Sequence, residues 1–177
     1  MTYTLRMPGS KSYTNRALLC AALAKGKTTL INPLESEDTA AMIKALTQMG
    51  ITVKKKSTER WEVLGGALIK PQSPLYLNNA GTAVRFLTAV LATRTFPVKI
   101  TGNERMRKRP IADLVDALRM CGARITYEER NDFLPITVQG PLTRKNCVVS
   151  GRISSQFISG LLMAAPLTAH GMTLLIK

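Results

Sequence analysis

The stretch Met49-Gly50-Ile51-Thr52-Val53 recurs further along the chain as Cys121-Gly122-Ala123-Arg124-Ile125. In both places a glycine ends a run of apolar residues at helical spacing, and a short run typical of a strand follows it. Glycine just after the last periodic residue is a common helix stop. The two stretches therefore indicate one structural unit that occurs at least twice, since long internal repeats are the sign of stacked supersecondary units.

The repeat extends in both directions from these glycines. In the first copy we expect helices over residues 10–24 and 37–49, and strands over 28–31, 51–53 and 60–64. In the second copy we expect helices over 79–92 and 110–120, and strands over 97–101, 124–127 and 134–138. A third copy begins with a helix over 154–165 and a strand over 172–176, and the sequence stops there. A short strand is expected to lead into each copy, at residues 4–6, 75–77 and 147–149.

This order predicts an α/β (α+β) fold made of pseudo-symmetric repeats of a βαβαββ unit, with the third repeat incomplete. The expected boundaries within a repeat domain of residues 10–177 are 10–66, 75–140 and 146–177. Repeated units bury their apolar faces against one another. We therefore expect the third unit to take its missing neighbour from elsewhere.

The chain carries a large positive charge. Its 177 residues include 25 Lys+Arg and 11 Asp+Glu, a formal net charge of +14, and the pI is about 10.2. Such a charge favours an anionic partner, which could be nucleic acid, a membrane surface or a phosphorylated small molecule. Residues 54–56, three lysines, are expected at a solvated strand end, whereas residues 105–109 form a denser cationic cluster in a segment without helical or strand periodicity.

Composition excludes several classes of protein. A hydrophobic share of 45% is too high for a disordered basic tail, and the apolar stretches are too short to span a membrane. Aromatic residues make up 5% of the chain and are scattered, which argues against a base-stacking surface for nucleic acid. Three distant cysteines favour reduced thiols in a cytoplasmic protein, with Cys20 in the core.

Small polar residues open the first helix of each copy. They are Gly9-Ser10-Lys11-Ser12, Asn79-Ala80-Gly81-Thr82 and Ser154-Ser155-Gln156. The first turn of a helix has free backbone N–H groups and the positive end of the helix dipole, so it can bind an anion or be closed by an ordinary N-cap. Lys11 and Arg16 in the first copy and Arg85 in the second add cations, which favours anion binding for the set.

Other motifs lack the context that their chemistry needs. Lys25-Gly26-Lys27-Thr28-Thr29 contains the letters of a phosphate loop, but it follows a helix and precedes a strand. His170 stands alone beside Gly171 and is expected in a surface turn. Asp38, Asp113 and Asp116 are expected to cap helices or to be solvated, so no acid/base catalyst is identified.

Four motifs in one order carry a resemblance to a known family. Residues 8–17, 79–85, 105–111 and 154–156 (PGSKSYTNRA, NAGTAVR, RMRKRPI and SSQ) resemble those of 5-enolpyruvylshikimate-3-phosphate synthases. The resemblance covers the whole chain and implies the N-terminal portion of such an enzyme. It implies a two-domain inside-out barrel architecture with the active site between the domains, residues 1–9 being a strand that leads in from the other domain.

The resemblance also implies an activity: transfer of the enolpyruvyl group of phosphoenolpyruvate to the 5-hydroxyl of shikimate 3-phosphate, without metal or organic cofactor. Residues expected to bind shikimate 3-phosphate are Lys11, Ser12, Arg16, Ser154, Ser155 and Gln156. Those expected to bind phosphoenolpyruvate are Lys11, Gly81, Arg109 and Gln156, and those expected to shape that pocket are Asn79, Thr82 and Arg85. Glyphosate is expected to compete at the phosphoenolpyruvate site, and bulk at position 81 to exclude it.

The chain departs from the family pattern at two positions and lacks its acid/base carboxylates. Asn78 stands where a glycine often precedes the asparagine, and Phe86 where a proline or leucine often follows the arginine. The resemblance places the family's carboxylates in a C-terminal half, so we expect such a half in cis or in trans and no activity from the chain alone. No nucleic acid or membrane is expected as partner. The alternatives are a non-catalytic module that binds a phospho-ligand or nucleic acid, and a related enolpyruvyl transferase.

Overall fold

The computed structural model describes residues 7–150 and 154–177. The chain divides into two compact units, Met1–Leu68 and Ile69–Lys177. The strand expected at residues 4–6 lies outside the described residues.

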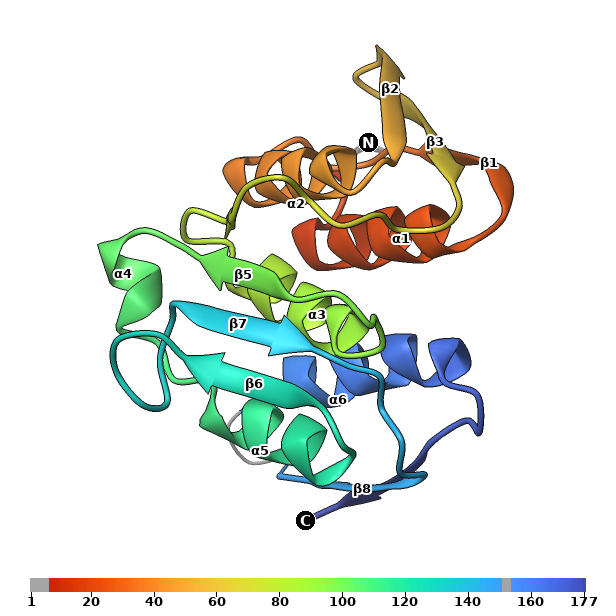
Figure 1. The fold of residues 1–177 in the computed structure, drawn as a ribbon. Helices are drawn as coiled ribbons and strands as arrows, with labels where there is room; N and C mark the ends of the chain where they lie inside the picture. Colours follow the sequence, from red (N-terminus) through yellow and green to blue (C-terminus); the bar gives the residue numbers. More distant parts are fainter. Residues whose placement is uncertain (1–6, 151–153) are drawn as a thin grey trace, which may run out of the picture. The chain divides into compact units, whose positions relative to one another are not determined.

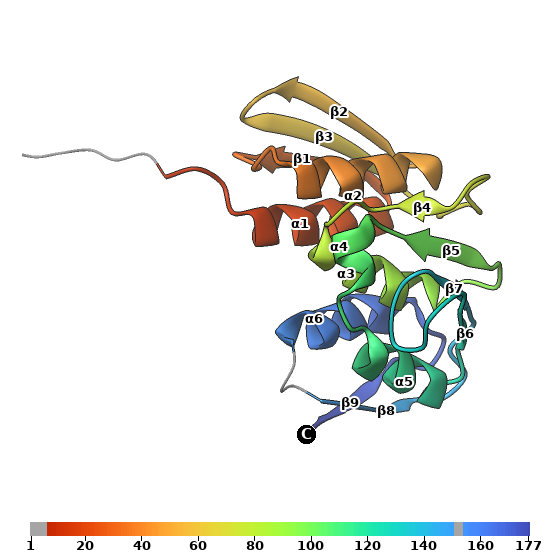
Figure 2. The ribbon, with the colours of Figure 1, turned by 90° about the vertical axis from the view of Figure 1, so that its left-hand side faces the viewer.

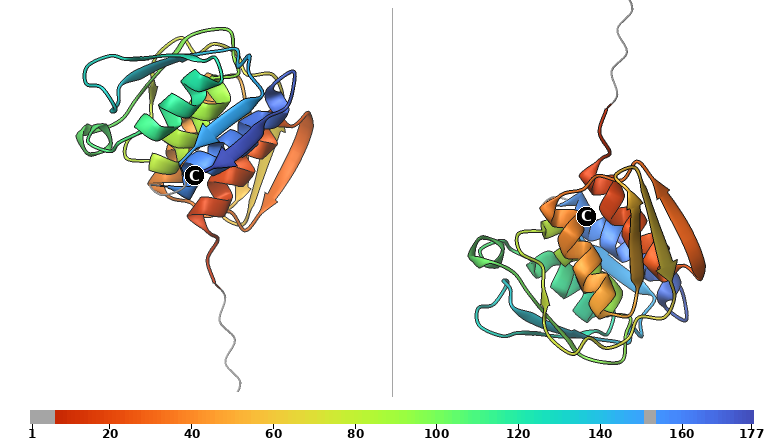
Figure 3. Two further views of the ribbon diagram at one scale, coloured as in Figure 1. Left: turned by 90° about the horizontal axis from the view of Figure 1, so that it is seen from below. Right: turned by 90° about the horizontal axis from the view of Figure 1, so that it is seen from above.

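The first unit consists of two helices and a three-stranded sheet. Its elements are α1 (Lys11–Leu23), β1 (Gly26–Ile31), α2 (Glu37–Gln48), β2 (Thr52–Ser57) and β3 (Arg60–Gly65). The strands are antiparallel in the order β1-β3-β2, and they lie along one side of the two helices (Figures 2 and 3). Trp61 and Val63 alternate with more exposed residues on β3 and are fully buried, as expected for a sheet with one covered face.

Local signals fix the ends of these elements. Ser36 and Thr39 form a reciprocal capping box at the start of α2, which satisfies backbone donors that the helix itself leaves free. After α2, Gly50 has a φ of +89°, the left-handed conformation that a chain commonly adopts just past a helix end. The sequence pattern therefore predicts this boundary for a physical reason.

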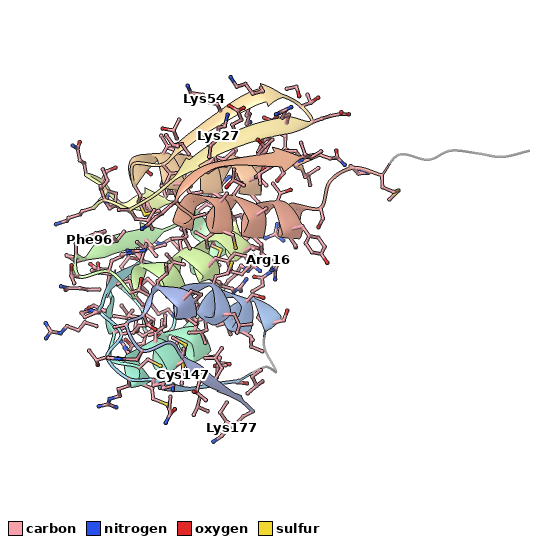
Figure 4. The ribbon with its side chains drawn as sticks, turned by 90° about the vertical axis from the view of Figure 1, so that its right-hand side faces the viewer. Arg16, Lys27, Lys54, Phe96, Cys147 and Lys177 are labelled. Carbon is pink, nitrogen blue, oxygen red and sulfur yellow. The ribbon has the colours of Figure 1, made fainter. Side chains whose placement is uncertain are left out.

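The outer face of this sheet carries lysines. Lys27 and Lys54 lie on its strands (Figure 4), and Nζ of Lys27 and of Lys56 are each 3.8 Å from a carboxylate oxygen of Glu62. The lysines at 54–56 belong to β2 itself and are exposed. Exposed pairs of this kind are weak, so this face contributes charge more than stability.

The second unit continues the alternation of helices and strands. Its elements are β4 (Leu75–Tyr76), α3 (Gly81–Leu91), β5 (Val98–Thr101), α4 (Glu104–Arg107), α5 (Ala112–Met120), β6 (Arg124–Tyr127), β7 (Ile136–Gln139), β8 (Asn146–Val149), α6 (Ser155–Ala164), the 3₁₀ helix η1 (Ala165–Leu167) and β9 (Thr173–Ile176). One sheet has the order β4-β5-β7-β6, and β8 pairs in parallel with β9.

Helix α3 forms the core of the second unit. Each of its residues from Gly81 to Leu91 is buried, because α6 lies beside it and α5, β5 and β7 also contact it (Figure 1). A Cβ on Gly160 of α6 would be 3.1 Å from the backbone oxygen of Arg85 and 3.3 Å from Cβ of Ala89. The glycine thus allows the close approach of the two helices.

Two sequence expectations are wrong. The segment 105–109 is not without regular structure, because α4 forms a single turn there, capped by the Asn103 side chain, which accepts a hydrogen bond from the Met106 amide at 2.9 Å. A helix of four residues is too short to show periodicity. Cys20 is exposed rather than in the core, because the apolar stripe of α1 is broad and Cys20 lies at its solvent edge. In the described part of the chain, no helix combines the length and the apolar character needed to cross a membrane.

Candidate anion-binding site

In the first unit the predicted cations gather at the start of α1. The Ser10 hydroxyl accepts a hydrogen bond from the Tyr13 amide at 3.5 Å, so the helix begins with a side-chain cap. Lys11 and Ser12 follow in the first turn and are exposed. One turn later, Nη1 of Arg16 donates to the backbone oxygen of Ser12 at 3.0 Å. The three residues therefore form one polar group on the first two turns.

Lys11 is held by an acid from the neighbouring helix. Its Nζ is 3.2 Å from Oδ2 of Asp38 in the first turn of α2, and its side chain is 49% exposed. A cation at a helix N-terminus opposes the helix dipole, and the Asp38 carboxylate offsets that cost. Asp38 is thus neither a cap nor fully solvated; it positions Lys11.

In the second unit, α3 begins without a side-chain cap. Its first residue is Gly81, and Ala80 before it offers no polar side chain. A Cβ placed on Gly81 would lie 2.6 Å from Nη1 of Arg109 and 2.9 Å from Nη1 of Arg85. Two guanidinium groups therefore converge on the backbone at the positive end of the helix, an arrangement suited to an anion.

Helix α6 brings the third motif to the same place. The Ser154 hydroxyl caps the helix by accepting a hydrogen bond from the backbone N–H of Gln156 at 3.2 Å. Nη1 of Arg85 donates to Oε1 of Gln156 at 2.6 Å, and Nε2 of Gln156 donates to Oγ1 of Thr82 at 3.2 Å. The side chain of Gln156 thus links the starts of α3 and α6.

The charge of Arg85 is costly where it lies. Its side chain is 6% exposed, it lies over the Phe157 ring with Cζ 5.4 Å from the ring centroid, and its Nε has no partner among the described residues. Burial, and then the positive charge of Arg109, lower the pKa of Arg85 to about 10. Arginine remains protonated at neutral pH, and an anion beside the two guanidiniums would relieve both costs.

Neither guanidinium is neutralised within the described residues. Every ion pair recorded there involves other side chains. Of the other acids considered from the sequence, Asp116 lies 3.9 Å from Nη1 of Arg119 and Asp113 is in the first turn of α5. The cluster around Gly81 therefore carries positive charge that no acid in the described part of the chain pairs with.

Asn78 anchors the segment before Arg109 by two hydrogen bonds to Asn103. Its φ is +47°, and its side-chain oxygen accepts from Nδ2 of Asn103 at 2.9 Å while its backbone oxygen accepts from the Asn103 amide at 3.0 Å. Asn103 in turn caps α4, and the Arg109 amide donates to the Met106 oxygen at 3.1 Å. Asparagine tolerates the left-handed region better than other non-glycine residues, so this position keeps the turn that a glycine would allow.

The structure therefore gathers the predicted residues into two clusters. One in the first unit contains Lys11, Ser12 and Arg16, and the other in the second unit contains Asn79, Gly81, Thr82, Arg85, Arg109, Ser154, Ser155 and Gln156. Sequence reasoning missed Phe157 and Asn103 because their contribution is packing and capping. It also missed the buried Oδ1 of Asn79, which has no partner among the described residues.

Residues 7–150 and 154–177 contain no group of three or more His, Cys, Asp or Glu side chains that could hold a metal ion. What the two clusters can do chemically is bind anions by backbone amides, hydroxyls and fixed cations.

The family profile and the most similar sequences that we compared point to the same family. The profile of the family described as EPSP synthase (3-phosphoshikimate 1-carboxyvinyltransferase) matches residues 1–177. The chain is 47% identical over 178 residues to the 3-phosphoshikimate 1-carboxyvinyltransferase of Escherichia coli O127:H6, covering 98% of this chain and 42% of that protein. The protein of the same name from Escherichia coli O1:K1 is 46% identical over the same span.

Solved structures agree with the sequence match. The 2.37 Å structure of EPSP synthase from Acinetobacter baumannii superposes with a TM-score of 0.86 at 29% sequence identity, covering 93% of this chain and 38% of that one. The predicted fold class is thereby confirmed. The chain spans 42% of the length of the Escherichia coli proteins that it matches.

Proposed function

The chain belongs to the EPSP synthase family, and on that premise we propose that it supplies part of the cleft in which the enolpyruvyl group of phosphoenolpyruvate is transferred to the 5-hydroxyl of shikimate 3-phosphate. The reaction releases phosphate and needs no metal or organic cofactor. Both substrates are polyanions that repel each other. A cationic site is therefore required to bring them together.

The observation that carries the proposal is the convergence on Gly81 of two guanidiniums, neither of which pairs with an acid in residues 7–150 and 154–177. Arg109 and the first amides of α3 would hold the phosphate or carboxylate of phosphoenolpyruvate, because a guanidinium donates two parallel hydrogen bonds to such groups. Gln156 would add a donor from α6. Arg85, Asn79 and Thr82 would shape the pocket.

The second substrate would be held by hydroxyls and by the cluster of the first unit. Ser154, Ser155 and Gln156 would bind shikimate 3-phosphate from α6, and Ser12 and Arg16 would bind it from α1. Lys11 would contact both substrates as a point charge, which suits an ammonium on a flexible stem. The pair with Asp38 at 3.2 Å supports this role, because it keeps the ammonium near the helix start.

Proton transfer requires groups that the two clusters do not contain. The chemistry needs an acid that protonates the methylene carbon of phosphoenolpyruvate and a base that accepts the hydroxyl proton. We propose that these come from a C-terminal half, in cis or in trans, that completes the third repeat unit of the domain formed by residues 10–177. Residues 1–9 would lead in from the second domain.

Two assays test the proposal on the 177-residue chain. Release of phosphate from a mixture of both substrates should be at background level, since neither of the two clusters contains the acid and base that the transfer requires. Calorimetric titration with shikimate 3-phosphate should give weak binding, in the millimolar range. Turnover by the pure chain would contradict the first part, and absence of heat at millimolar ligand would contradict the second.

The proposal extends to inhibition and location. Glyphosate should compete with phosphoenolpyruvate at the Gly81 cluster, and the chain should act in the cytoplasm. Competition is measured by repeating the phosphoenolpyruvate titration in the presence of glyphosate.

A nucleic-acid-binding module is the different class to exclude, because the lysines on the outer face of the first sheet add to a net charge of +14. Binding to random DNA that weakens steeply with salt, with no binding to shikimate 3-phosphate, would favour that alternative.

A further inference from the structure

Both polar atoms of the Gln156 side-chain amide are hydrogen-bonded, Oε1 to Arg85 and Nε2 to Thr82. Nη1 of Arg85 contacts its Oε1 at 2.6 Å, and Oγ1 of Thr82 contacts its Nε2 at 3.2 Å. A guanidinium has five donors and no acceptor, so the amide atom that faces it must be the oxygen. Arg85 therefore decides which way round the amide lies.

This orientation leaves Gln156 with a donor to offer. Its oxygen is occupied by a charged donor, whereas Nε2 has two hydrogens and only one is directed to Thr82. If the amide were reversed, the group left to face a ligand would be an oxygen, which repels an anion.

Arg85 is well placed to act on Gln156 rather than on solvent. It is the charged residue of a helix whose residues are all buried, and the Phe157 ring lies against its guanidinium. Its Nη1 is directed at both Gly81 and Gln156. A long side chain confined in this way loses little further freedom when it holds a partner.

We propose that Arg85 is a positioning residue, which holds Gln156 so that its amide nitrogen faces an anionic ligand at the start of α3. The inference rests on the proposed function, because that ligand is a phosphate or carboxylate of a substrate. It goes further because Arg85, which need not touch substrate, decides whether Gln156 offers the ligand a hydrogen-bond donor or an acceptor.

The first part of the test is made without ligand. Side-chain ¹⁵N–¹H signals of Gln156, identified by their loss in Gln156→Glu, should show two well-separated protons in the unmodified chain. Arg85→Met should move them toward the values of a solvated glutamine, and Arg85→Lys, which restores a donor, should return them part of the way. Arg124→Met, which alters an exposed arginine on β6, is the matched control and should leave them in place.

The second part is a titration with phosphoenolpyruvate and, separately, inorganic phosphate. Either ligand should shift the Nε2 proton that does not face Thr82. Arg85→Met and Gln156→Glu should each weaken binding by roughly tenfold or more, the usual effect of losing a hydrogen bond to a charged group. Gln156→Glu should keep its thermal stability, because a carboxylate still accepts from Arg85.

The outcomes separate the inference from the function on which it rests. Gln156 signals that are unchanged in Arg85→Met overturn the positioning role, even if binding weakens through loss of charge. Equal binding by Gln156→Glu and the unmodified chain overturns the donor role while leaving the site intact. Failure of the unmodified chain to bind either ligand overturns both the inference and the phosphoenolpyruvate site.

Discussion

Gly81 is the position at which the smallest change should have the largest effect on binding. Gly81→Ala adds one methyl group at the start of α3, where the φ angle is ordinary for any residue. The new Cβ would lie 2.6 Å from Nη1 of Arg109 and 2.9 Å from Nη1 of Arg85. The variant therefore tests whether the ligand is held at the start of α3, by Arg109 and by the Gln156 amide that Arg85 positions.

The size of the effect follows from these distances. An ordinary contact begins near 3.4 Å, so Nη1 of Arg109 must retreat by about 3.4 − 2.6 = 0.8 Å and Nη1 of Arg85 by about 3.4 − 2.9 = 0.5 Å. A retreat of about 0.8 Å takes a hydrogen bond near 2.9 Å out of bonding range. Losing one charged hydrogen bond costs about 1.5–3 kcal/mol, which weakens binding roughly 10- to 150-fold.

The fold should not suffer. Alanine is favoured over glycine in a helix by up to about 1 kcal/mol, and the atoms displaced are the terminal nitrogens of two arginine side chains rather than backbone atoms. We expect the free energy of unfolding of Gly81→Ala to stay within about 1 kcal/mol of that of the unmodified chain.

Two glycine variants provide controls in the calorimetric titration with phosphoenolpyruvate and in thermal unfolding. Gly66→Ala meets no atom within 4 Å and should change neither quantity. At Gly140 a Cβ would lie 2.0 Å from the backbone oxygen of Ala92, so Gly140→Ala should lower stability. Unchanged affinity in Gly81→Ala would refute the account of this cluster, as would an affinity loss that merely follows a loss of stability.

Three further predictions concern other groups. Asp38→Asn removes the carboxylate that holds Lys11, 3.2 Å away, near the helix start, and should weaken binding of shikimate 3-phosphate several-fold, with a stability change below about 1 kcal/mol because the Lys11 side chain is half exposed; unchanged or tighter binding in the calorimeter would show that the carboxylate competes with the ligand rather than positions Lys11. Burial raises the pKa of Tyr127 to about 12, so the neutral phenol stabilises the fold fully below about pH 10 and this stabilisation is lost as the pH rises through about 12. Tyr127→Phe should remove the last step of a tyrosinate absorbance titration and should make the free energy of unfolding depend less on pH in the alkaline range. An unchanged last step would contradict the shift. A thiol reagent should modify one cysteine of the folded chain, Cys20, because the other two are buried, so Cys20→Ser should abolish the rapid reaction; rapid modification of a second thiol would contradict this burial.

The sequence predicts most of the fold because its boundaries depend on local chemistry. Gly50 and Gly122 both have positive φ and both follow a helix, so the repeated stretches identify real ends. The short helix α4 could not be predicted, because four residues do not show a period and its cap depends on Asn103 and its bond to the distant Asn78.

The candidate site could be predicted as a set of residues but not as a geometry. The small polar residues at three helix starts are visible in the sequence, and so are the nearby cations. The bond from Arg85 to Gln156 joins residues that lie 71 positions apart, and nothing local indicates it. Likewise, a lysine near a helix start does not reveal that Asp38 of another helix holds it.

The central claim is that these helix starts bind the phosphorylated substrates of an EPSP synthase. Its most direct test is a titration of the isotope-labelled 177-residue chain with shikimate 3-phosphate, followed by NMR. The account predicts saturable shifts at millimolar ligand in the backbone signals of Lys11, Ser12 and Arg16 and in those of Ser155 and Gln156, with unlabelled DNA causing none at the same ionic strength. Shifts confined to the exposed lysines of β2, or none at either cluster, would contradict it.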